Sequence, residues 1–273
     1  MINIGTVLLS YHAVGKTILN SVPQVFVNAH QTGDQSTDMV NSKRHEYELA
    51  ALTQMIPQVT DSNRALFVLD GSLIFWQLES FEPSIKQMYL TAYLQSLEKF
   101  YMANCMVASY ISMPRSKELL NLIRVALCNF NFDCLAPADV VEQLVDTHIM
   151  HGYLQPYNRT QVFQNNSSIV EQYPLALRPY FFYLHVGSEI GRVEIPGWIA
   201  QDANAVDRVA SYLLDQAVKG RGYPVCLAEA HEQAVVKGPD RDFFYHLIQK
   251  IGLEQKQRIA VSQKSIKKRR MGI

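Results

Sequence analysis

Asp70 stands where an α/β protein would bind a ligand. It ends the apolar run of residues 65–70, ALFVLD, and Gly71 follows it directly. A short, continuous apolar run is typical of a strand buried on both faces. Because α/β folds bind ligands at the carboxyl ends of their strands, Asp70 is a candidate site residue. The competing interpretation is an Asp-Gly turn, which is common.

A second carboxylate, Glu48, belongs to the helix predicted before this strand. It precedes Leu49, which forms an apolar stripe with Leu52 and Met55. A carboxylate at the border of that stripe can point toward the end of the Asp70 strand. The alternative is a solvated glutamate paired with Arg44 one helical turn earlier. Acidic ligands suit Mg²⁺ and Mn²⁺, since both ions prefer oxygen.

Other catalytic motifs do not occur in the sequence. There is no GxxxxGK[ST] loop for ATP phosphates, and Ser72 lacks the GxSxG context of a hydrolase nucleophile. The histidines form no HExxH pattern, and the i, i+3 pair His148 and His151 is more often incidental than metal binding. No CxxC pair is present, so free, buried thiols are expected rather than a zinc site or disulfides at Cys105, Cys128, Cys134 and Cys226.

Composition predicts a globular protein with a sizeable core. The chain has 273 residues, of which 48% are hydrophobic and 18% charged. Its 25 Lys and Arg residues balance 25 Asp and Glu residues, so net charge gives no reason to expect nucleic acid, although a local basic groove remains compatible. No apolar run approaches the ~20 residues that span a bilayer, and no signal peptide precedes the first strand, so the cytoplasm is expected.

Apolar periodicity and chain breakers predict the elements that must position the two acids. Strands are expected at residues 2–11, 22–28, 65–70 and 105–112, and a hairpin at residues 181–196. Helices are expected at residues 42–55, 84–101, 116–128, 202–218 and 227–236, with others near Asp146 and after Pro239. Residues 29–42 and 151–174 are typical of loops. This order predicts an α/β fold with a mixed sheet and helices on both faces.

The order strand, strand, helix with Glu48, strand with Asp70 resembles ribonuclease H-like nucleases, which bind two divalent ions ~3.5–4 Å apart. Five further blocks follow one another in an order similar to the bacterial form of the NurA family of DNA-repair nucleases. They are ALFVLDGSLIFWQLE, YISMPRSKELLNLIR, LVDTHIMHGYLQPYNRTQVF, FYLHVGSEIGRVEIPGWIA and YPVCLAEAHEQAVVKG. The resemblance covers residues 1 to about 250.

This resemblance implies a ribonuclease H-like fold and a homodimer with a central channel. It also implies Mn²⁺-dependent (or Mg²⁺-dependent) 5′–3′ exonuclease and single-strand endonuclease activity in DNA end resection, with a hexameric HerA-type translocase as partner. We expect the nuclease domain to span residues 1–255 and a basic tail to span residues 256–273.

The family's site residues carry over one by one. Its helical metal ligand matches Glu48, through the Arg-x-x-x-Glu spacing from Arg44, and its strand aspartate matches Asp70. Its late helical ligand matches best at His231, with Asp146 as the second choice.

Basic residues supply the predicted DNA contacts. Arg115 is a candidate phosphate ligand because arginine binds phosphate through two donors. Within KSIKKRR, the candidate contacts to the DNA backbone are Lys267, Lys268, Arg269 and Arg270. The alternative for this segment is a solvated tail.

One departure from the family concerns the first strand. The family opens with a DGS-type aspartate just before the segment that matches residues 2–11, and this sequence begins with that segment. We therefore expect one metal aspartate and its central strand to be missing, and cleavage by this chain to be weak. The alternative function is a non-enzymatic relic or interaction protein that keeps the dimer and translocase surfaces.

Overall fold

The computed structural model describes residues 2–11, 15–24, 35–128 and 143–236, together with residues 238, 243, 246 and 250. The chain divides into two units, Met1–Ala234 and Val235–Ile273. All elements below belong to the first unit. The described residues 243, 246 and 250 are helical, in agreement with the helix predicted after Pro239. The predicted boundary at residue 255 and the basic tail lie outside the described residues. In the part of the chain that is described, no helix has the length and apolar character to cross a membrane.

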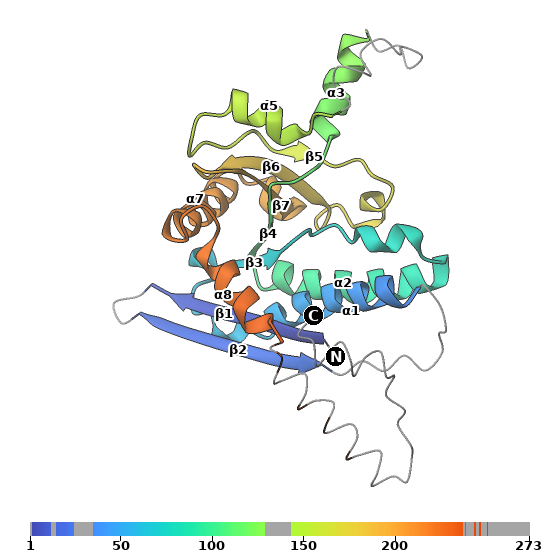
Figure 1. Cartoon of the computed structure of the whole chain (residues 1–273), viewed down its shortest axis with the longest axis vertical. Coiled ribbons are helices and arrows are strands. Elements are labelled where there is room, and N and C mark those ends of the chain that lie inside the picture. Colours follow the sequence, from blue (N-terminus) through green and yellow to red (C-terminus); the bar gives the residue numbers. More distant parts are fainter. Residues whose placement is uncertain are drawn as a thin grey trace. The chain divides into compact units, whose positions relative to one another are not determined.

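A five-stranded mixed sheet forms the centre of the first unit (Figure 1). Its strand order is β3 (Leu66–Asp70), β4 (Met106–Ser112), β7 (Ile190–Pro196), β6 (Pro179–His185) and β5 (Phe163–Gln164). The β3–β4 pair is parallel and the other pairs are antiparallel. The predicted α/β fold, with a mixed sheet flanked by helices, is confirmed.

Both faces of the sheet are buried, which explains the continuous apolar runs of its strands. Side chains alternate along β3, so that Phe67 and Leu69 face one core while Leu66 and Val68 face another. The first core contains residues of α1 (Gln35–Thr53) and α2 (Pro83–Met102). The second contains residues of α6 (Gly197–Ala200) and α7 (Ala203–Lys219). The carboxyl end of β3 therefore lies between two helical layers.

The first two strands form a hairpin that is separate from the main sheet. Among the described residues, strand β1 (Ile2–Ser10) pairs only with β2 (Lys16–Gln24), so β1 lacks a partner on its other side, where the family has its aspartate-bearing strand. Helix α8 (Val225–Ala234) lies against β1 (Figure 1). A Cβ atom at Gly5 would come within 1.9 Å of the Ala230 carbonyl oxygen, so glycine permits this close approach.

A third cluster lies at the β5–β6 side of the sheet. Helices α3 (Glu118–Leu127) and α5 (Asp146–Tyr153) contact each other there. Leu119 of α3 and Met150 of α5 pack with Phe181 and Tyr183 of β6. These contacts connect α3 to the strands that carry the polar residues described below.

Several predicted elements are confirmed, and two begin elsewhere. Strands β3 and β4, the β6–β7 hairpin and helices α2 and α7 match their predicted ranges within two residues. Helix α1 begins at Gln35 rather than at residue 42, because Met39 within the polar stretch packs against the first core. Strand β2 begins at Lys16 rather than at residue 22, and residues 25–28 of the expected strand lie outside the described residues.

Candidate functional site

Asp70 is the last residue of β3, and its carboxylate is exposed. Its backbone is fixed by pairing with Tyr110 of β4, and the amide of Gly71 donates to the Tyr110 carbonyl oxygen at 3.0 Å. The hydroxyl of Tyr223 donates to Asp70 Oδ1, also at 3.0 Å. Asp70 thus has the position at a strand end that the sequence predicts, with one carboxylate oxygen held by a tyrosine.

Glu48 lies on α1 and its side chain is 29% exposed. Burial raises the pKa of its carboxyl to about 7, the Arg44 guanidinium acts in the opposite direction, and the charge of Asp70 raises the pKa further. The Arg44 Nε atom is 3.6 Å from Glu48 Oε1, so this pair is a loose one. The effect of Asp70 on Glu48 means that the two predicted acids share one electrostatic environment.

This shared environment predicts a pH effect on stability. The pKa of Glu48 is about 7 in the fold and has an ordinary value of 4.5, so the fold favours the protonated carboxyl. Its contribution to stability is fully present below pH 4.5 and is lost as the pH rises through about 7. We expect the melting temperature of the metal-free protein to fall across this window and Glu48→Gln to reduce the fall.

Scanning calorimetry from pH 5 to pH 8 measures this effect. Glu46→Gln is the matched control, because Glu46 lies on the same helix and pairs with Lys43 at 2.7 Å. An equal pH dependence in wild type and Glu48→Gln would contradict the assignment.

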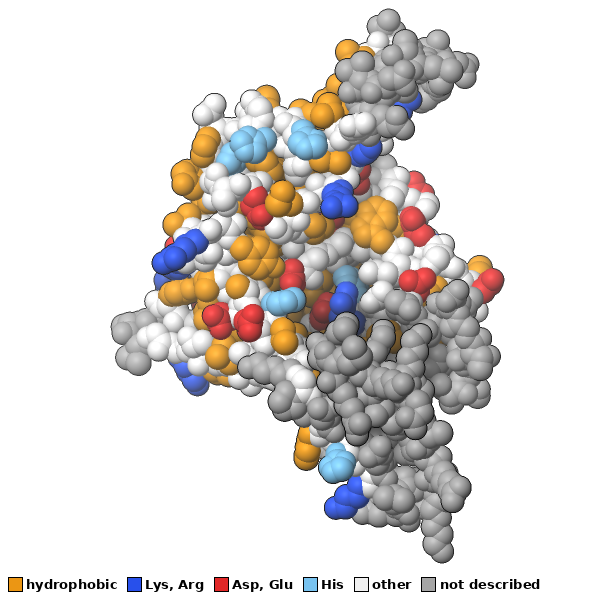
Figure 2. All heavy atoms as spheres, viewed as in Figure 1, with side chains coloured by type: hydrophobic (Ala, Val, Ile, Leu, Met, Phe, Trp, Pro, Cys, Tyr) orange, Lys and Arg blue, Asp and Glu red, His pale blue; other side chains and the backbone are white. Residues whose placement is uncertain are grey.

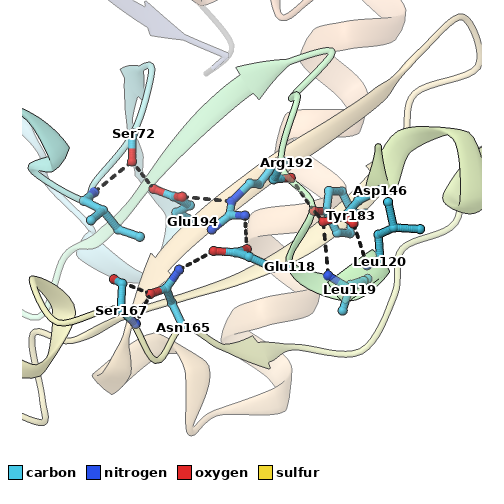
Figure 3. A network of polar contacts seen from close by, with 12 residues as sticks. Ser72, Glu118, Leu119, Leu120, Asp146, Asn165, Ser167, Tyr183, Arg192 and Glu194 are labelled. Carbon is cyan, nitrogen blue, oxygen red and sulfur yellow. Dashed lines mark hydrogen bonds and ion pairs between the residues drawn. The ribbon is translucent and has the colours of Figure 1, made fainter. Parts of the chain in front are cut away.

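The segment after Asp70 is anchored by the buried carboxylate of Glu194, on the central strand β7 (Figure 3). Glu194 Oε2 accepts hydrogen bonds from Ser72 Oγ at 2.7 Å and from the Leu73 amide at 2.8 Å. The hydroxyls of Tyr93 and Tyr173 donate to the Leu73 carbonyl oxygen at 3.1 and 3.3 Å. Both polar groups of the Leu73 backbone therefore have buried partners, and the end of β3 is held rigidly.

Arg192 extends this network to α3. Its Nε donates to Glu194 Oε1 at 2.9 Å, and its Nη1 donates to Glu118 Oε2. Its guanidinium carbon is 3.9 Å from the centroid of the Phe181 ring. Burial alone would lower the pKa of Arg192, but the charges of Glu194 and Glu118 outweigh burial and raise it. Arg192 and Glu194 were not predicted, although charged residues inside an apolar strand were a visible signal.

Asp146 lies in a different place from Asp70 and Glu48. It is fully buried at the first residue of α5, and it accepts hydrogen bonds from the amides of Leu119 and Leu120 at 3.3 and 2.8 Å. The Tyr183 hydroxyl also donates to it, at 2.7 Å. These donors make Asp146 the cap of α3. The nearby Ser116 hydroxyl does not cap α3 and bonds to the Tyr183 hydroxyl at 2.7 Å.

We expect Asp146→Ala to destabilise the fold by about 2–3 kcal/mol, because it removes a helix cap and leaves buried donors without an acceptor. Urea unfolding measures the loss, and Asp146→Asn should lose less because its amide oxygen still accepts. DNA cleavage per folded molecule should stay unchanged. Lost cleavage by a variant that is still folded would support Asp146 as a metal ligand.

The remaining predicted residues are dispersed. His231 lies exposed on α8, and Arg115 is exposed between β4 and α3. Lys267, Lys268, Arg269 and Arg270 lie outside the described residues. Within the described ranges, no group of three or more His, Cys, Asp or Glu side chains is arranged to hold a metal ion. Over the described part of the face in Figure 2, Lys and Arg side chains are interspersed with Asp and Glu side chains.

Cys105 and Cys226 carry free thiols, as predicted. Cys105 and Cys128 are buried, Cys226 is partly buried, and Cys134 lies outside the described residues. Burial raises the pKa of Cys226 to about 11 and also raises that of Cys105. These two thiols therefore stay protonated at neutral pH and are poor nucleophiles.

Glu48 and Asp70 fit a divalent ion by donor chemistry and by charge. Carboxylate oxygens suit Mn²⁺ and Mg²⁺. A cation between the two acids would also offset the repulsion with which Asp70 raises the pKa of Glu48. The same two positions lie beside the rigid Ser72–Leu73 backbone, which limits movement of the site.

Comparison with protein families places the chain in a known group. A family model described as the NurA domain matches residues 42–236, which include α1 from residue 42 onward, the five-stranded sheet and α8. The chain belongs to the NurA family. The match includes Glu48, Asp70 and His231, whereas the β1–β2 hairpin precedes it. A search of curated proteins found no match.

A solved structure supports the fold of this NurA-family chain. It is similar to the crystal structure of the NurA nuclease from Sulfolobus solfataricus, with a TM-score of 0.56 and 14% sequence identity. The similarity covers 93% of this chain and 83% of that one. At this identity the comparison establishes the shared fold, and the residues of the site have to be argued from their own geometry.

Proposed function

We propose that this NurA-family chain is a metal-dependent DNA nuclease. The observation that carries the proposal is the placement of two acids, with Asp70 at the carboxyl end of β3 and Glu48 on α1, which contacts β3. A metal site that cleaves phosphodiesters requires carboxylates placed in this way. The structurally similar protein from Sulfolobus solfataricus is itself a NurA nuclease, which supports the same reaction class.

Glu48 and Asp70 would hold Mn²⁺ or Mg²⁺. A bound divalent ion supplies polarisation of a phosphate oxygen and a more acidic water molecule. Arg44 is exposed beside Glu48 and would attract a DNA phosphate there. The family resemblance offers His231 as a third ligand, because Asp146 already accepts hydrogen bonds from Leu119, Leu120 and Tyr183. Among the described residues, however, His231 does not form a group of three metal-binding side chains with the two acids.

The finer activity follows from the family resemblance. We propose 5′–3′ exonuclease and single-strand endonuclease activity in DNA end resection, as a cytoplasmic homodimer that works with a HerA-type hexameric translocase. Arg115 and the tail residues Lys267, Lys268, Arg269 and Arg270 would contact the DNA backbone. Such contacts would give salt-dependent affinity without sequence preference.

A non-enzymatic interaction protein is the second candidate. The observation in its favour is that, among the described residues, only a pair of acids and no group of three metal-binding side chains comes together. Such a protein would bind DNA or its partners without cleaving DNA.

Incubation of the full chain with end-labelled single-stranded and double-stranded DNA separates the two candidates. We expect cleavage with Mn²⁺ and none with EDTA. Binding of DNA without cleavage at any Mn²⁺ concentration would refute the nuclease and favour the interaction protein.

A further inference from the structure

The turn between α7 and α8 adopts a conformation that its residues do not favour. Helix α7 ends in a Schellman motif, in which the Gly222 amide donates to the Ala217 carbonyl at 2.8 Å and the Arg221 amide donates to the Val218 carbonyl at 3.2 Å. Arg221 has a φ of 57°, where glycine is the usual residue. Strain of this kind persists only where the surroundings enforce the conformation.

The surroundings of this turn are the β6–β7 turn. Gly222 has a φ of +119°, and a Cβ atom at that position would lie 2.3 Å from Ser188 Oγ. The two turns therefore meet closely at a position where a larger residue would not fit. Tyr223 follows Gly222 directly, so the contact between the turns fixes where the backbone of Tyr223 begins.

The Tyr223 ring is fixed in turn by an aromatic neighbour. It meets the Tyr110 ring edge-on, with ring centroids 5.8 Å apart. The Tyr110 hydroxyl donates to Glu189 Oε1 at 2.8 Å, so the two tyrosines have different carboxylate partners. The Tyr223 hydroxyl donates to Asp70 Oδ1 at 3.0 Å. Burial and the charge of Asp70 both raise the pKa of Tyr223, so its hydroxyl keeps the proton that it donates.

We propose that Tyr223 is a positioning residue for Asp70, holding its exposed carboxylate in the orientation that binds a divalent ion beside Glu48. The inference rests on the proposed function. An exposed carboxylate at a strand end would otherwise exchange between rotamers, and a ligand that is already oriented binds a metal ion more tightly. The strained turn and its contact with Ser188 place Tyr223 so that its hydroxyl reaches Asp70.

Tyr223→Phe tests this role, since it removes the hydroxyl and keeps the ring. The matched control is Tyr110→Phe, which removes the other tyrosine–carboxylate hydrogen bond of the same ring pair without touching Asp70. Mn²⁺ affinity of the full chain is measured from the electron paramagnetic resonance signal of free Mn²⁺, with Asp70→Ala as the reference for a lost site. Melting temperatures show that each variant is folded.

We expect Tyr223→Phe to bind Mn²⁺ about tenfold more weakly than wild type. This is the low end of the loss that follows when the hydrogen-bond partner of a metal ligand is removed, and it applies here because Asp70 is exposed. Tyr110→Phe should keep the wild-type affinity, and excess Mn²⁺ should restore DNA cleavage by Tyr223→Phe.

Two results would overturn the role of Tyr223 and leave the metal site standing. One is wild-type affinity in Tyr223→Phe, and the other is an equal loss in both tyrosine variants, which would indicate packing alone. If wild type bound Mn²⁺ no better than Asp70→Ala, the proposed metal site would itself be refuted, and the role of Tyr223 with it.

Discussion

Asp70→Ala is expected to abolish Mn²⁺-dependent DNA cleavage while leaving the fold intact. Removing one preorganised electrostatic group from an active site costs about 10²–10³ in rate, and loss of a metal ligand should cost at least as much. The fold should tolerate the change because the Asp70 side chain is exposed and its backbone pairing with Tyr110 remains. Among the described residues, the change removes the hydrogen bond from the Tyr223 hydroxyl, so the stability should change by about 1 kcal/mol or less.

A single-turnover assay on end-labelled DNA measures this rate, and circular dichroism checks the fold. The matched control is Asp215→Asn, another exposed aspartate, which pairs with Lys219 on α7. It should cleave DNA at the wild-type rate, whereas Glu48→Gln should lose activity as Asp70→Ala does. Wild-type cleavage by Asp70→Ala would mean that Asp70 only terminates the strand in an Asp-Gly turn.

Local sequence signals sufficed for the elements that carry the two acids. The run ALFVLD became β3 because a strand buried on both faces has to be apolar at every position. The apolar stripe beside Glu48 became part of the first core, in which Leu49 and Met55 are buried and against which Leu52 packs. Placement of Glu48 and Asp70 followed from these elements, because a strand end and a neighbouring helix border are local properties of the chain.

The supports of the site depend on contacts between distant segments, and sequence patterns do not contain them. Glu194 lies far along the chain from Ser72, and their hydrogen bond exists only because β7 is placed near β3 through β4. Tyr223 reaches Asp70 through a turn whose conformation depends on Ser188. Asp146 is the converse case. The family resemblance suggested that it is a metal ligand, whereas the amides of Leu119 and Leu120 make it the cap of α3.

Arg192→Met is expected to destabilise the protein by about 3–5 kcal/mol, because it leaves a buried charge without its partner. Glu194 is 1% exposed and would keep its charge next to Ser72 and Leu73, so the loss should also loosen the end of β3. Urea unfolding followed by circular dichroism measures the free energy of unfolding.

The comparison within the chain is Arg159→Met, because Arg159 pairs with Asp207 at 2.6 Å and the Asp207 side chain is 65% exposed. Exposed ion pairs contribute about 0–1 kcal/mol, so this variant should lose far less stability than Arg192→Met. The double variant Arg192→Met with Glu194→Leu should recover part of the loss, since it removes both buried charges together. Equal losses in Arg192→Met and Arg159→Met would mean that burial of the Arg192–Glu194 pair has no energetic consequence. The rigidity of the Ser72–Leu73 segment would then have to come from the hydroxyls of Tyr93 and Tyr173 alone.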